Sequence, residues 1–454
     1  MTQQAIGKYR WTICALLFFA TTVNYLDRQV LSLLQPYLAE KYDWTNTDYA
    51  NITSVFQFGY ALSLLFAGRI IDKLGTKKGY MWAIIIWSLA AMIHALSIPI
   101  GEGISAILGW FGIAGFSVSV MGFMFSRAIL AFGEAGNFPA AIKTTAEYFP
   151  KKERSLATGI FNSGTNVGAI LAPLTVPWIR VNWGWETAFV IMGIIGFLWL
   201  VFWFKYYEKP EKQKKLSAAE FEYIHSGEEE KGTDGAGDDK KTSWMKLFGY
   251  KQTWAFTFGK FMTDGVWWFF LFWLPSYLKV QYGIVDKAVM LPLAFLYSLA
   301  MIGSIVGGWF PVYFIKKGYN PYDGRMKAML LIAFFPLVIL LAQPLGSISY
   351  WWPVLLIGIG ASAHQAWSAN IFTTVSDMFP KKAIASVVGI GGMAGGIGGV
   401  VTSKSGGALF DHYKKLGHIE TGYTIMFSIC AVAYLIAWFV MKSLVPKYKP
   451  ITDL

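Results

Sequence analysis

The chain has 454 residues, of which 55% are hydrophobic, 17% aromatic and only 15% charged. A soluble protein of this length carries about a quarter charged residues, so the composition indicates a membrane protein. The formal net charge of +12 comes from lysines and arginines that lie between apolar runs, and this placement argues against nucleic-acid binding.

Apolar residues form about twelve continuous runs, each near the roughly 20 residues that a helix needs to cross a bilayer. We therefore predict an all-α polytopic membrane protein with twelve transmembrane helices. The fourth run is too long for one simple span, so its limits stay open. In chain order the runs lie near residues 11–33, 50–71, 79–99, 107–149, 154–178, 186–206, 252–279, 288–315, 327–345, 350–379, 384–409 and 422–443.

The first run is long and lacks a small-residue cleavage site, so we expect a retained helix rather than a removed signal peptide. The two cysteines, Cys14 and Cys430, both lie in apolar runs. They predict neither a disulfide framework nor a metal site, and we expect no cofactor.

Lysine and arginine residues are concentrated in the termini and in every second loop. Because loops rich in these residues stay in the cytoplasm, both termini are predicted to be cytoplasmic, in agreement with an even number of spans. The rich set is Lys8, Arg10, Arg69, Lys73, Lys77, Lys78, Lys151, Lys152, Arg154, Lys316, Lys317, Arg325, Lys381, Lys382, Lys442 and Lys447, and the alternate loops carry Lys41, Arg180, Lys279, Lys287, Lys414 and Lys415.

A charged segment at residues 208–250 interrupts the apolar runs at the middle of the chain. We predict a cytoplasmic linker there, mobile near 228–241, between two six-helix halves at 1–207 and 251–454. The halves repeat each other, because "EYFPKKERSLATG" (147–159) matches "DMFPKKAIASVVG" (377–389) at a constant shift of 230 residues. A repeat of equal orientation predicts two parallel halves with a substrate site between them, near the membrane midplane.

The segment "GRIIDKLGTKKG" (68–79) follows the second run and carries Gly68, Asp72, Lys73 and Gly75. It resembles the loop between helices two and three of the major facilitator superfamily, and this resemblance implies a gating role. Gly68 would allow close helix contact, and Asp72 would cap a helix or pair with a cation. The second half holds only a degraded echo, Gly308 with "IKKGYNPYDGR".

Two further stretches narrow the resemblance. "NYLDRQVLS" in the first span, with "RAILAFGEAGNFPAA" (127–141) in the fourth, resembles the anion:cation symporter family, whose members carry organic anions, typically sugar acids, with protons or sodium. "GKFMTDGVWWFFLFWLP" (259–275) is similar to the hexuronate transporters within that family. The resemblance covers nearly the whole chain and implies Asp27 and Glu134 as proton-coupling carboxylates.

Charged residues inside the spans are costly, at about 2.5–3.5 kcal/mol each, and persist where they line a cavity or have a partner. Arg28 and Arg127 are the first substrate-binding candidates, because a guanidinium matches a carboxylate bidentately. The alternative is internal pairing, of Arg28 with Asp27 or of Arg127 with Glu134. Neighbours on a helix point about 100° apart, so Asp27 and Arg28 cannot share a direction, whereas Arg127 and Glu134 lie on one helix face.

Asp27 and Glu134 are acceptors that can change charge, and their alternative role is a fixed salt bridge or a helix cap. His364 occupies the position of Glu134 in the repeat and is expected to be structural. Lys260 and Asp264 lie at i and i+4, where they can neutralise each other, unless Lys260 reaches a substrate oxygen. Trp267 and Trp268 are expected to pack or to anchor the membrane interface rather than to stack on a sugar.

Lys404 lies in the eleventh span with no acid near it in the sequence, so it either snorkels to a membrane surface or faces the cavity. Close helix packing explains the neighbouring "GIGGMAGGIGGV" (389–400). Neutral polar residues at candidate cavity depth either hydrogen-bond a substrate's hydroxyl groups or bridge helices, and Tyr60 resembles the family's helix-two tyrosine. They are Tyr25, Tyr60, Asn137, Asn162, Asn166, Gln365 and Asn370.

These features predict a monomeric secondary active transporter in a bacterial-type inner membrane, whose partners are the lipid bilayer and a small organic anion. It would import a sugar-acid monoanion, first of all a hexuronate such as galacturonate or glucuronate, by proton symport through alternating access. Alternatives are import of another organic anion such as a hexonate with H⁺ or Na⁺, exchange of organophosphate or phosphate, and a transporter-like sensor. A membrane enzyme is disfavoured, because no metal cluster or nucleophile triad is apparent.

The asymmetry of Lys and Arg gives a prediction about topology. A thiol reagent applied outside intact cells should label a cysteine placed at residue 415 and miss one placed at residue 235. Labelling of residue 235 from outside would overturn this orientation.

Overall fold

The computed structural model describes residues 7–112, 115–225 and 244–454, and these residues form helices and loops without a strand. The α-helices are α1 (Tyr9–Lys41), α2 (Asn46–Leu74), α3 (Thr76–Ile93), α4 (Ser97–Trp110), α5 (Val118–Glu134), α6 (Asn137–Tyr148), α7 (Lys151–Trp183), α8 (Trp185–Tyr206), α9 (Ala218–His225), α10 (Trp244–Leu247), α11 (Lys251–Tyr282), α12 (Met290–Val306), α13 (Trp309–Lys316), α14 (Pro321–Phe334), α15 (Ala342–Gly346), α16 (Trp351–Met378), α17 (Lys381–Lys415) and α18 (Ile419–Leu444). Short 3₁₀ turns are η1 (His94–Leu96), η2 (Pro210–Lys212), η3 (Asp286–Val289) and η4 (Phe335–Leu341).

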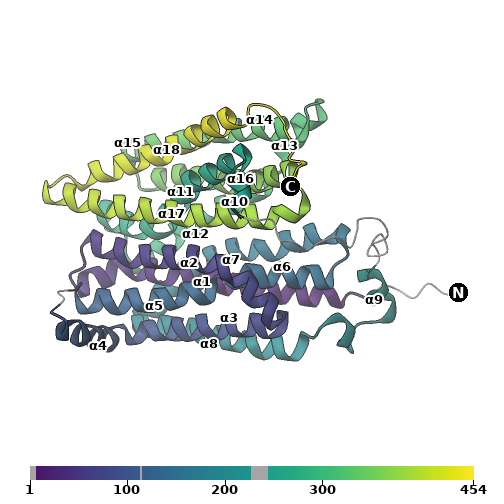
Figure 1. Ribbon diagram of the computed structural model, residues 1–454. Coiled ribbons are helices and arrows are strands. Elements are labelled where there is room, and N and C mark those ends of the chain that lie inside the picture. The colour runs from purple at the N-terminus through teal and green to yellow at the C-terminus, as the bar shows by residue number, and fades with distance from the viewer. Residues whose placement is uncertain (1–6, 113–114, 226–243) are drawn as a thin grey trace.

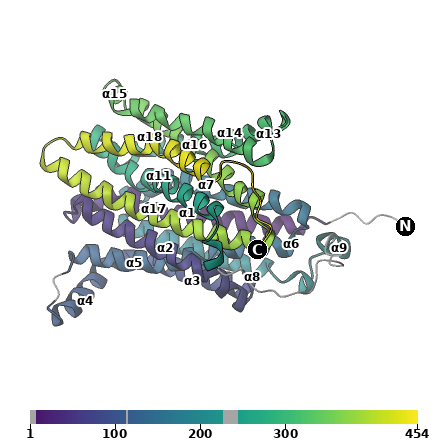
Figure 2. The same cartoon turned by 45° about the horizontal axis from the view of Figure 1, so that its top comes forward.

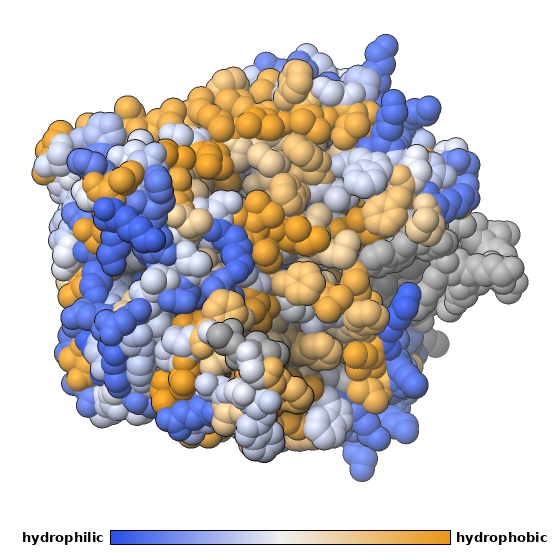
Figure 3. All heavy atoms as spheres, turned by 60° about the vertical axis from the view of Figure 1, so that its left-hand side comes forward, coloured by the Kyte–Doolittle hydropathy of each residue, from blue (hydrophilic) through white to orange (hydrophobic). Residues whose placement is uncertain are grey.

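The predicted spans coincide with these helices, and some spans are built from two helices in series. The long fourth run (107–149) begins in the last turn of α4 and continues through α5 and α6, whereas most of α4 follows α3 and η1 in the preceding span. Helix α4 lies at one end of the bundle (Figure 1). Ser97 and Gly101 of α4 pack on α5 so closely that a methyl group on Gly101 would lie 1.9 Å from the carbonyl oxygen of Val118. The fold is that of an all-α membrane protein, and apolar residues cover its flank between two more hydrophilic ends (Figure 3).

Eight helical segments among the described residues are long and apolar enough by themselves to cross a membrane. The long helices α1, α7, α11 and α16 are outside this set. They include the helices that carry Asp27 and Arg28, Lys260 and Asp264, and His364. Their lower hydropathy therefore reflects polar residues that face the protein interior rather than lipid.

Helices α1–α8 lie together on one side of the molecule and α11–α18 on the other (Figures 1 and 2). The repeat found in the sequence has the same local geometry in both groups, because Pro150 and Pro380 precede α7 and α17 with φ, ψ of −61°, 153° and −64°, 149°. Division of the chain at residues 208–250 stays a prediction, and its expected mobile part (228–241), with residue 235, lies outside the described residues.

The start of α1, the linker helix α9 and the C-terminal residues share one end of the molecule, called here the linker end (Figure 1). Arg10 of α1 forms ion pairs with Glu153 at 2.9 Å and with Glu220 of α9 at 3.0 Å. Lys246 donates a hydrogen bond to the carbonyl oxygen of Asp453 at 2.8 Å. The described part of the linker is therefore held against the helix bundles.

The glycines of α17 allow close packing on two helices, as the sequence predicted. A methyl group on Gly398 would lie 2.0 Å from the carbonyl oxygen of Phe261 in α11, and one on Gly396 would lie 2.6 Å from Ala61 of α2. Helix α17 is thus wedged between its own group and the first group. The expectation for Gly68 was wrong in this structure, because a methyl group there would meet no atom within 4 Å.

This packing predicts that Gly398→Ala destabilises the protein. The added methyl group would collide with the backbone of α11, and such overpacking costs about 1–3 kcal/mol. The matched control is Gly159→Ala, because no atom lies within 4 Å of the added group and alanine favours a helix over glycine. Thermal unfolding in detergent should show a lower midpoint for Gly398→Ala only, and equal midpoints would contradict the close packing of α17.

Candidate functional site

The centre of the molecule holds an ion pair between helices that are far apart in the sequence. Arg28 of α1 donates through Nε at 2.9 Å and through Nη2 at 2.7 Å to Oε2 of Glu134, the last residue of α5. The two residues are 2% and 0% exposed. Both charges are removed from water, so each is compensated by its hydrogen-bonded partner. Loss of either partner would leave the other charge buried and unpaired, at a high cost in stability. Neither internal pairing considered from the sequence occurs.

Four aromatic rings surround the Arg28 guanidinium. Its central carbon lies 4.7 Å from the ring centre of Tyr60, 4.8 Å from Tyr25, and 5.3 Å from both Phe56 and Trp268. Cations are attracted to aromatic faces at these distances. Tyr25 belongs to α1, Phe56 and Tyr60 to α2, and Trp268 to α11 of the second group. The Arg28 site therefore lies where the two groups of helices meet.

Arg127 of α5 is 2% exposed and approaches the same place. Its terminal nitrogens lie 3.4 and 3.5 Å from the backbone carbonyl oxygen of Arg28, and its Nε has no hydrogen-bond partner among the described residues. Its guanidinium lies 5.3 Å from the ring centre of Phe56. Arg127 is therefore a second buried cation whose hydrogen bonds are long and incomplete.

Asp27 is 3% exposed, and neither carboxylate oxygen has a hydrogen-bond partner within the described protein. The same is true of both amide atoms of Asn24, one turn earlier on α1. Arg28 is turned away from Asp27 toward α5, as the 100° step between helical neighbours requires. The cluster thus contains an unpaired buried carboxylate beside the paired one.

Helix α11 supplies a second ion pair, Lys260 Nζ to Asp264 Oδ2 at 2.7 Å. The Lys260 ammonium also lies 4.4 Å from the ring centre of Phe372 on α16. The mutual neutralisation that the i, i+4 spacing suggested therefore occurs here. Lys260 is 5% exposed, so the pair lies inside the protein.

His364 is a structural residue, as predicted. Its ring stacks on Trp267 with centres 5.1 Å apart and planes 7° apart, and its Nδ1 lies 2.9 Å from the Tyr434 hydroxyl. Of the adjacent tryptophans, Trp267 therefore packs inside the second group, whereas Trp268 reaches the Arg28 site. Position in the sequence did not distinguish these two neighbours.

The remaining polar candidates are dispersed. Asn370 donates to the carbonyl oxygens of Gly307 and Ala366, so it bridges α16 to the end of α12. Asn166 is buried, Asn162 is exposed and Gln365 is half-buried. Lys404 donates to the Asn51 amide oxygen and lines a groove that none of the Arg28 site residues lines. Phe56, which contacts both arginines, was missed by sequence reasoning; its i, i+4 spacing with Tyr60 was the available signal.

The motif at 68–79 spans the end of α2, Gly75 and the start of α3, and it lies at the linker end, away from the Arg28 site. Asp72 pairs with Lys143 of α6 at 2.9 Å, and Lys73 is exposed. Gly75 joins α2 to α3 with φ of +79°, a conformation that favours glycine. The motif therefore fixes the α2–α3 turn and links it to α6.

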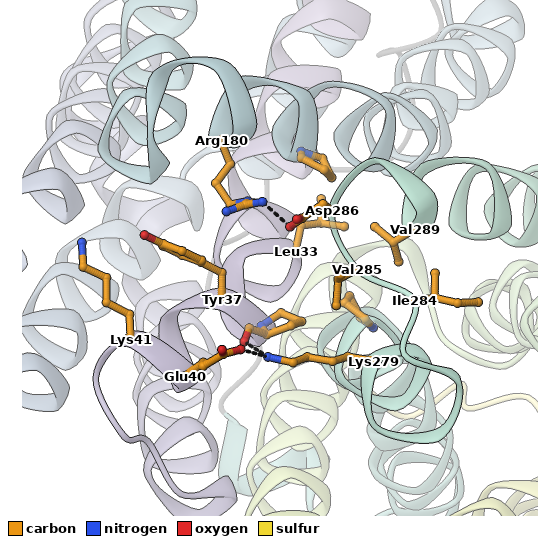
Figure 4. Close-up of a pocket in the computed structure, with 13 residues that line it drawn as sticks. Leu33, Tyr37, Glu40, Lys41, Arg180, Lys279, Ile284, Val285, Asp286 and Val289 are labelled. Carbon is orange, nitrogen blue, oxygen red and sulfur yellow. Dashed lines mark hydrogen bonds and ion pairs between the residues drawn. The ribbon is translucent and has the colours of Figure 1, made fainter.

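The opposite end holds a cavity of about 530 Å³ between the two groups (Figure 4). Two ion pairs beside this cavity join the groups; in one the cation comes from the first group, and in the other it comes from the second. Arg180 of α7 pairs with Asp286 of η3, and Lys279 of α11 pairs with Glu40 of α1 at 2.8 Å. Each group thus supplies one cation and one anion.

A third contact joins the groups at this end. Asp411 of α17 accepts hydrogen bonds from the backbone N–H groups of Asn46 at 2.9 Å and Thr47 at 2.7 Å, the first two residues of α2. A carboxylate at this position satisfies unpaired N–H groups and complements the helix dipole. Other side-chain contacts between the groups, from Tyr49 to the carbonyl oxygen of Phe272 and from Lys404 to Asn51, lie toward this end.

Comparison with known proteins gives concordant results. A family model described as Major Facilitator Superfamily matches residues 17–403. The hexuronate transporter of Escherichia coli (strain K12) is 29% identical over 443 residues, covering 96% of this chain and 94% of that protein. The galacturonate transporter of Dickeya chrysanthemi is 32% identical over 307 residues, covering 68% and 83%. A crystal structure of a D-xylose-proton symporter, 14% identical, has a TM-score of 0.71 and covers 98% and 100%, which supports the fold.

The Arg28–Glu134 pair predicts strong coupling in stability. Arg28→Met would leave the Glu134 carboxylate buried without its partner, at a cost of about 3–5 kcal/mol. The double change Arg28→Met with Glu134→Gln should recover much of this loss, because no buried charge of the pair remains. Unfolding midpoints of the two single variants and the double variant give the coupling, and additive losses would show that the pair does not form.

Proposed function

The chain belongs to the major facilitator superfamily, and we propose that it is a proton-coupled symporter that imports a sugar-acid monoanion. A hexuronate such as galacturonate or glucuronate is the first candidate substrate, because relatives matching most of the chain are named hexuronate and galacturonate transporters. The family and these relatives are transporters rather than enzymes. A bacterial-type inner membrane is the proposed location.

The observation that carries this proposal is the buried Arg28 guanidinium where the two groups of helices meet. Arg28 keeps its charge at any working pH, and its planar fork fits a carboxylate. Trp268 of α11 completes its surroundings from the second group. Transporters of this architecture bind their substrate at the junction between the two bundles, so a permanent cation there would hold an anionic substrate during alternating access.

Glu134 gives a physical route to coupling. In the structure it occupies Nε and Nη2 of Arg28, the donors that a substrate carboxylate would use. A proton on Glu134 neutralises this competitor and releases the fork for a bidentate pair with the substrate. One proton and one monoanion together leave the net charge of the site unchanged, so each favours the binding of the other.

Asp27 and Arg127 complete the proposed site. Asp27 is a buried carboxylate with no partner in the described protein, so we assign it the second position for a proton. Arg127 makes only long contacts to a backbone carbonyl, and it therefore retains donors for the substrate. Both lie beside Arg28 in the first group.

The hydroxyl groups of the substrate would be bound mainly by residues of the second group. Trp268 offers a ring next to Arg28, and Lys260 and Gln365 offer polar atoms from α11 and α16, with Asn162, Asn166 and Tyr60 on the opposite side. Asn370 and Lys404 are left out, because Asn370 bridges two helices and Lys404 lines a separate groove. This set is narrower than the one proposed from the sequence.

The end opposite the linker end, called here the closed end because ion pairs join the two groups there, indicates the proposed state of the transporter. With the termini and linker in the cytoplasm, the end crossed by Arg180–Asp286 and Lys279–Glu40 faces outward. The structure would then be closed to the outside, and opening outward would break both ion pairs together. Asp72 of the motif and its partner Lys143 of α6 would lie at the cytoplasmic end.

Uptake into proteoliposomes tests the substrate and the coupling ion. A panel of labelled galacturonate, glucuronate, galactonate and a short monocarboxylate is offered under an imposed pH gradient, a sodium gradient or neither. We expect a pH gradient alone to drive accumulation of a hexuronate. Accumulation driven only by sodium would overturn proton coupling, and accumulation of none of the sugar acids would overturn the substrate class.

We predict that Glu134→Gln and Asp27→Asn each lose gradient-driven accumulation, and that at least one retains counterflow exchange of labelled for unlabelled substrate. The reason is that a neutral amide resembles the protonated acid, so the substrate still binds while no proton is carried. Unfolding midpoints control for folding. If both variants still accumulate substrate against a gradient, these carboxylates do not couple transport to protons.

A further inference from the structure

A groove on the flank of the molecule combines an apolar lining with one lysine. It has a volume of about 370 Å³ and lies where α2 is flanked by α5 and α17 (Figure 2). Phe58 of α2, Met124 of α5 and Val400 of α17 form apolar walls. Phe58 is 57% exposed, so the groove opens sideways. A groove open to the flank of a membrane helix bundle faces lipid.

The cation in this groove is Lys404 of α17. It is exposed, and its ammonium donates a hydrogen bond to the neutral amide oxygen of Asn51. No ion pair involves Lys404 among the described residues. A lysine charge among apolar groups is unfavourable without an anion, so the groove matches a ligand that is itself negatively charged.

A second polar group lies in the same groove. Ser54 is 5% exposed, and its hydroxyl has no hydrogen-bond partner among the described residues. Ser54 follows Asn51 by three residues, so both lie on the face of α2 that lines the groove. The groove therefore offers an ammonium and an unused hydroxyl donor close to each other.

The depth of Lys404 places it near a membrane surface. Asp411 is level with the first residues of α2, and Lys404 lies seven residues earlier on α17, or about 10 Å deeper. The side chain reaches to Asn51, only about 7 Å into α2. With 29 residues, α2 is roughly 43 Å long and overhangs a hydrocarbon core of about 30 Å, so the ammonium lies close to lipid headgroup level, as in snorkelling.

We propose that this groove binds an anionic phospholipid, with the phosphate on Lys404 and Ser54 and an acyl chain along Phe58, Met124 and Val400. A free anion such as a sugar acid could satisfy the lysine but would leave the apolar walls exposed. The walls come from both groups of helices, α2 and α5 on one side and α17 on the other. A bound lipid therefore favours the state in which α2 and α17 are packed together, which is the state of this structure.

Lipid binding to the purified protein tests the proposal without any sugar acid. The wild type, Lys404→Gln and the control Lys415→Gln, which removes a charge at the end of the same helix, are placed in bilayers of phosphatidylcholine with or without roughly one third phosphatidylglycerol. Native mass spectrometry counts retained phosphatidylglycerol, and unfolding midpoints report stabilisation. We expect Lys404→Gln to bind phosphatidylglycerol about fivefold more weakly, the effect of one lysine near a membrane surface, and Lys415→Gln to resemble the wild type.

Two further arms distinguish a bound lipid from a bound free anion. Glycerol phosphate carries the headgroup chemistry without acyl chains and should not stabilise the protein, whereas equal stabilisation would assign the lysine to a free anion and overturn the proposal. Ala128→Phe, which fills the groove from α5 while keeping Lys404, should weaken phosphatidylglycerol retention. In phosphatidylcholine alone, which offers no anionic lipid, Lys404→Gln should be at least as stable as the wild type. Retention within about twofold of the wild type in both groove variants would also overturn the proposal.

Discussion

The desolvated guanidinium of Arg28 is the constraint on which the rest of the structure depends. A charge that cannot be removed by deprotonation must be compensated inside the protein. Glu134 does this through two hydrogen bonds, and four aromatic rings complete the surroundings. These groups come from α1, α2, α5 and α11, so the four helices must converge at one point. Close approach elsewhere, such as glycines of α17 against α2 and α11, brings the two groups near enough for Trp268 to reach Arg28.

The contacts at the closed end differ from the Arg28–Glu134 pair in strength. The Glu40 and Asp286 side chains are 78% and 46% exposed, and ion pairs that water and salt reach contribute less to stability than buried ones. The reciprocal arrangement of the two pairs still selects one alignment of the groups, because a shifted alignment would separate both cations from both anions. Under the proposed function, weak and specific contacts of this kind would suit an end that closes and reopens, whereas the Arg28–Glu134 pair lies within the first group.

Local patterns predicted the helices, the repeat at Pro150 and Pro380, and the close packing at Gly396 and Gly398. Apolar runs, repeated segments and clusters of small residues can each be recognised within a short stretch of sequence. The partner of Arg28 was not predictable in this way. Glu134 is 106 residues away, and spacing along a helix reveals only partners on the same helix, such as Asp264 for Lys260. The same limit applies to Lys404. A sequence shows that a lysine lies in a span, but the rotation of α17 against α2 decides whether it faces the interior or the flank. Gly68 was misjudged because the motif suggested close contact, which this state of the protein does not show.

The repeat also shows how the two groups have diverged. The stretch 127–159 aligns without a gap with 357–389, so Arg127 corresponds to Ile357 and Glu134 to His364. Ile357 is 1% exposed, and His364 is held by Trp267 and Tyr434. In the second group, packed side chains thus occupy the positions of these two charged residues, and its own charges, Lys260 and Asp264, pair with each other. Under the proposed function, the substrate carboxylate and the coupling proton both belong to the first group. When the proton and the substrate anion are both bound, or both absent, the net charge of the site is the same. The barrier to movement of the second group relative to the first would be lowest in these two states, because neither leaves an uncompensated charge between the groups.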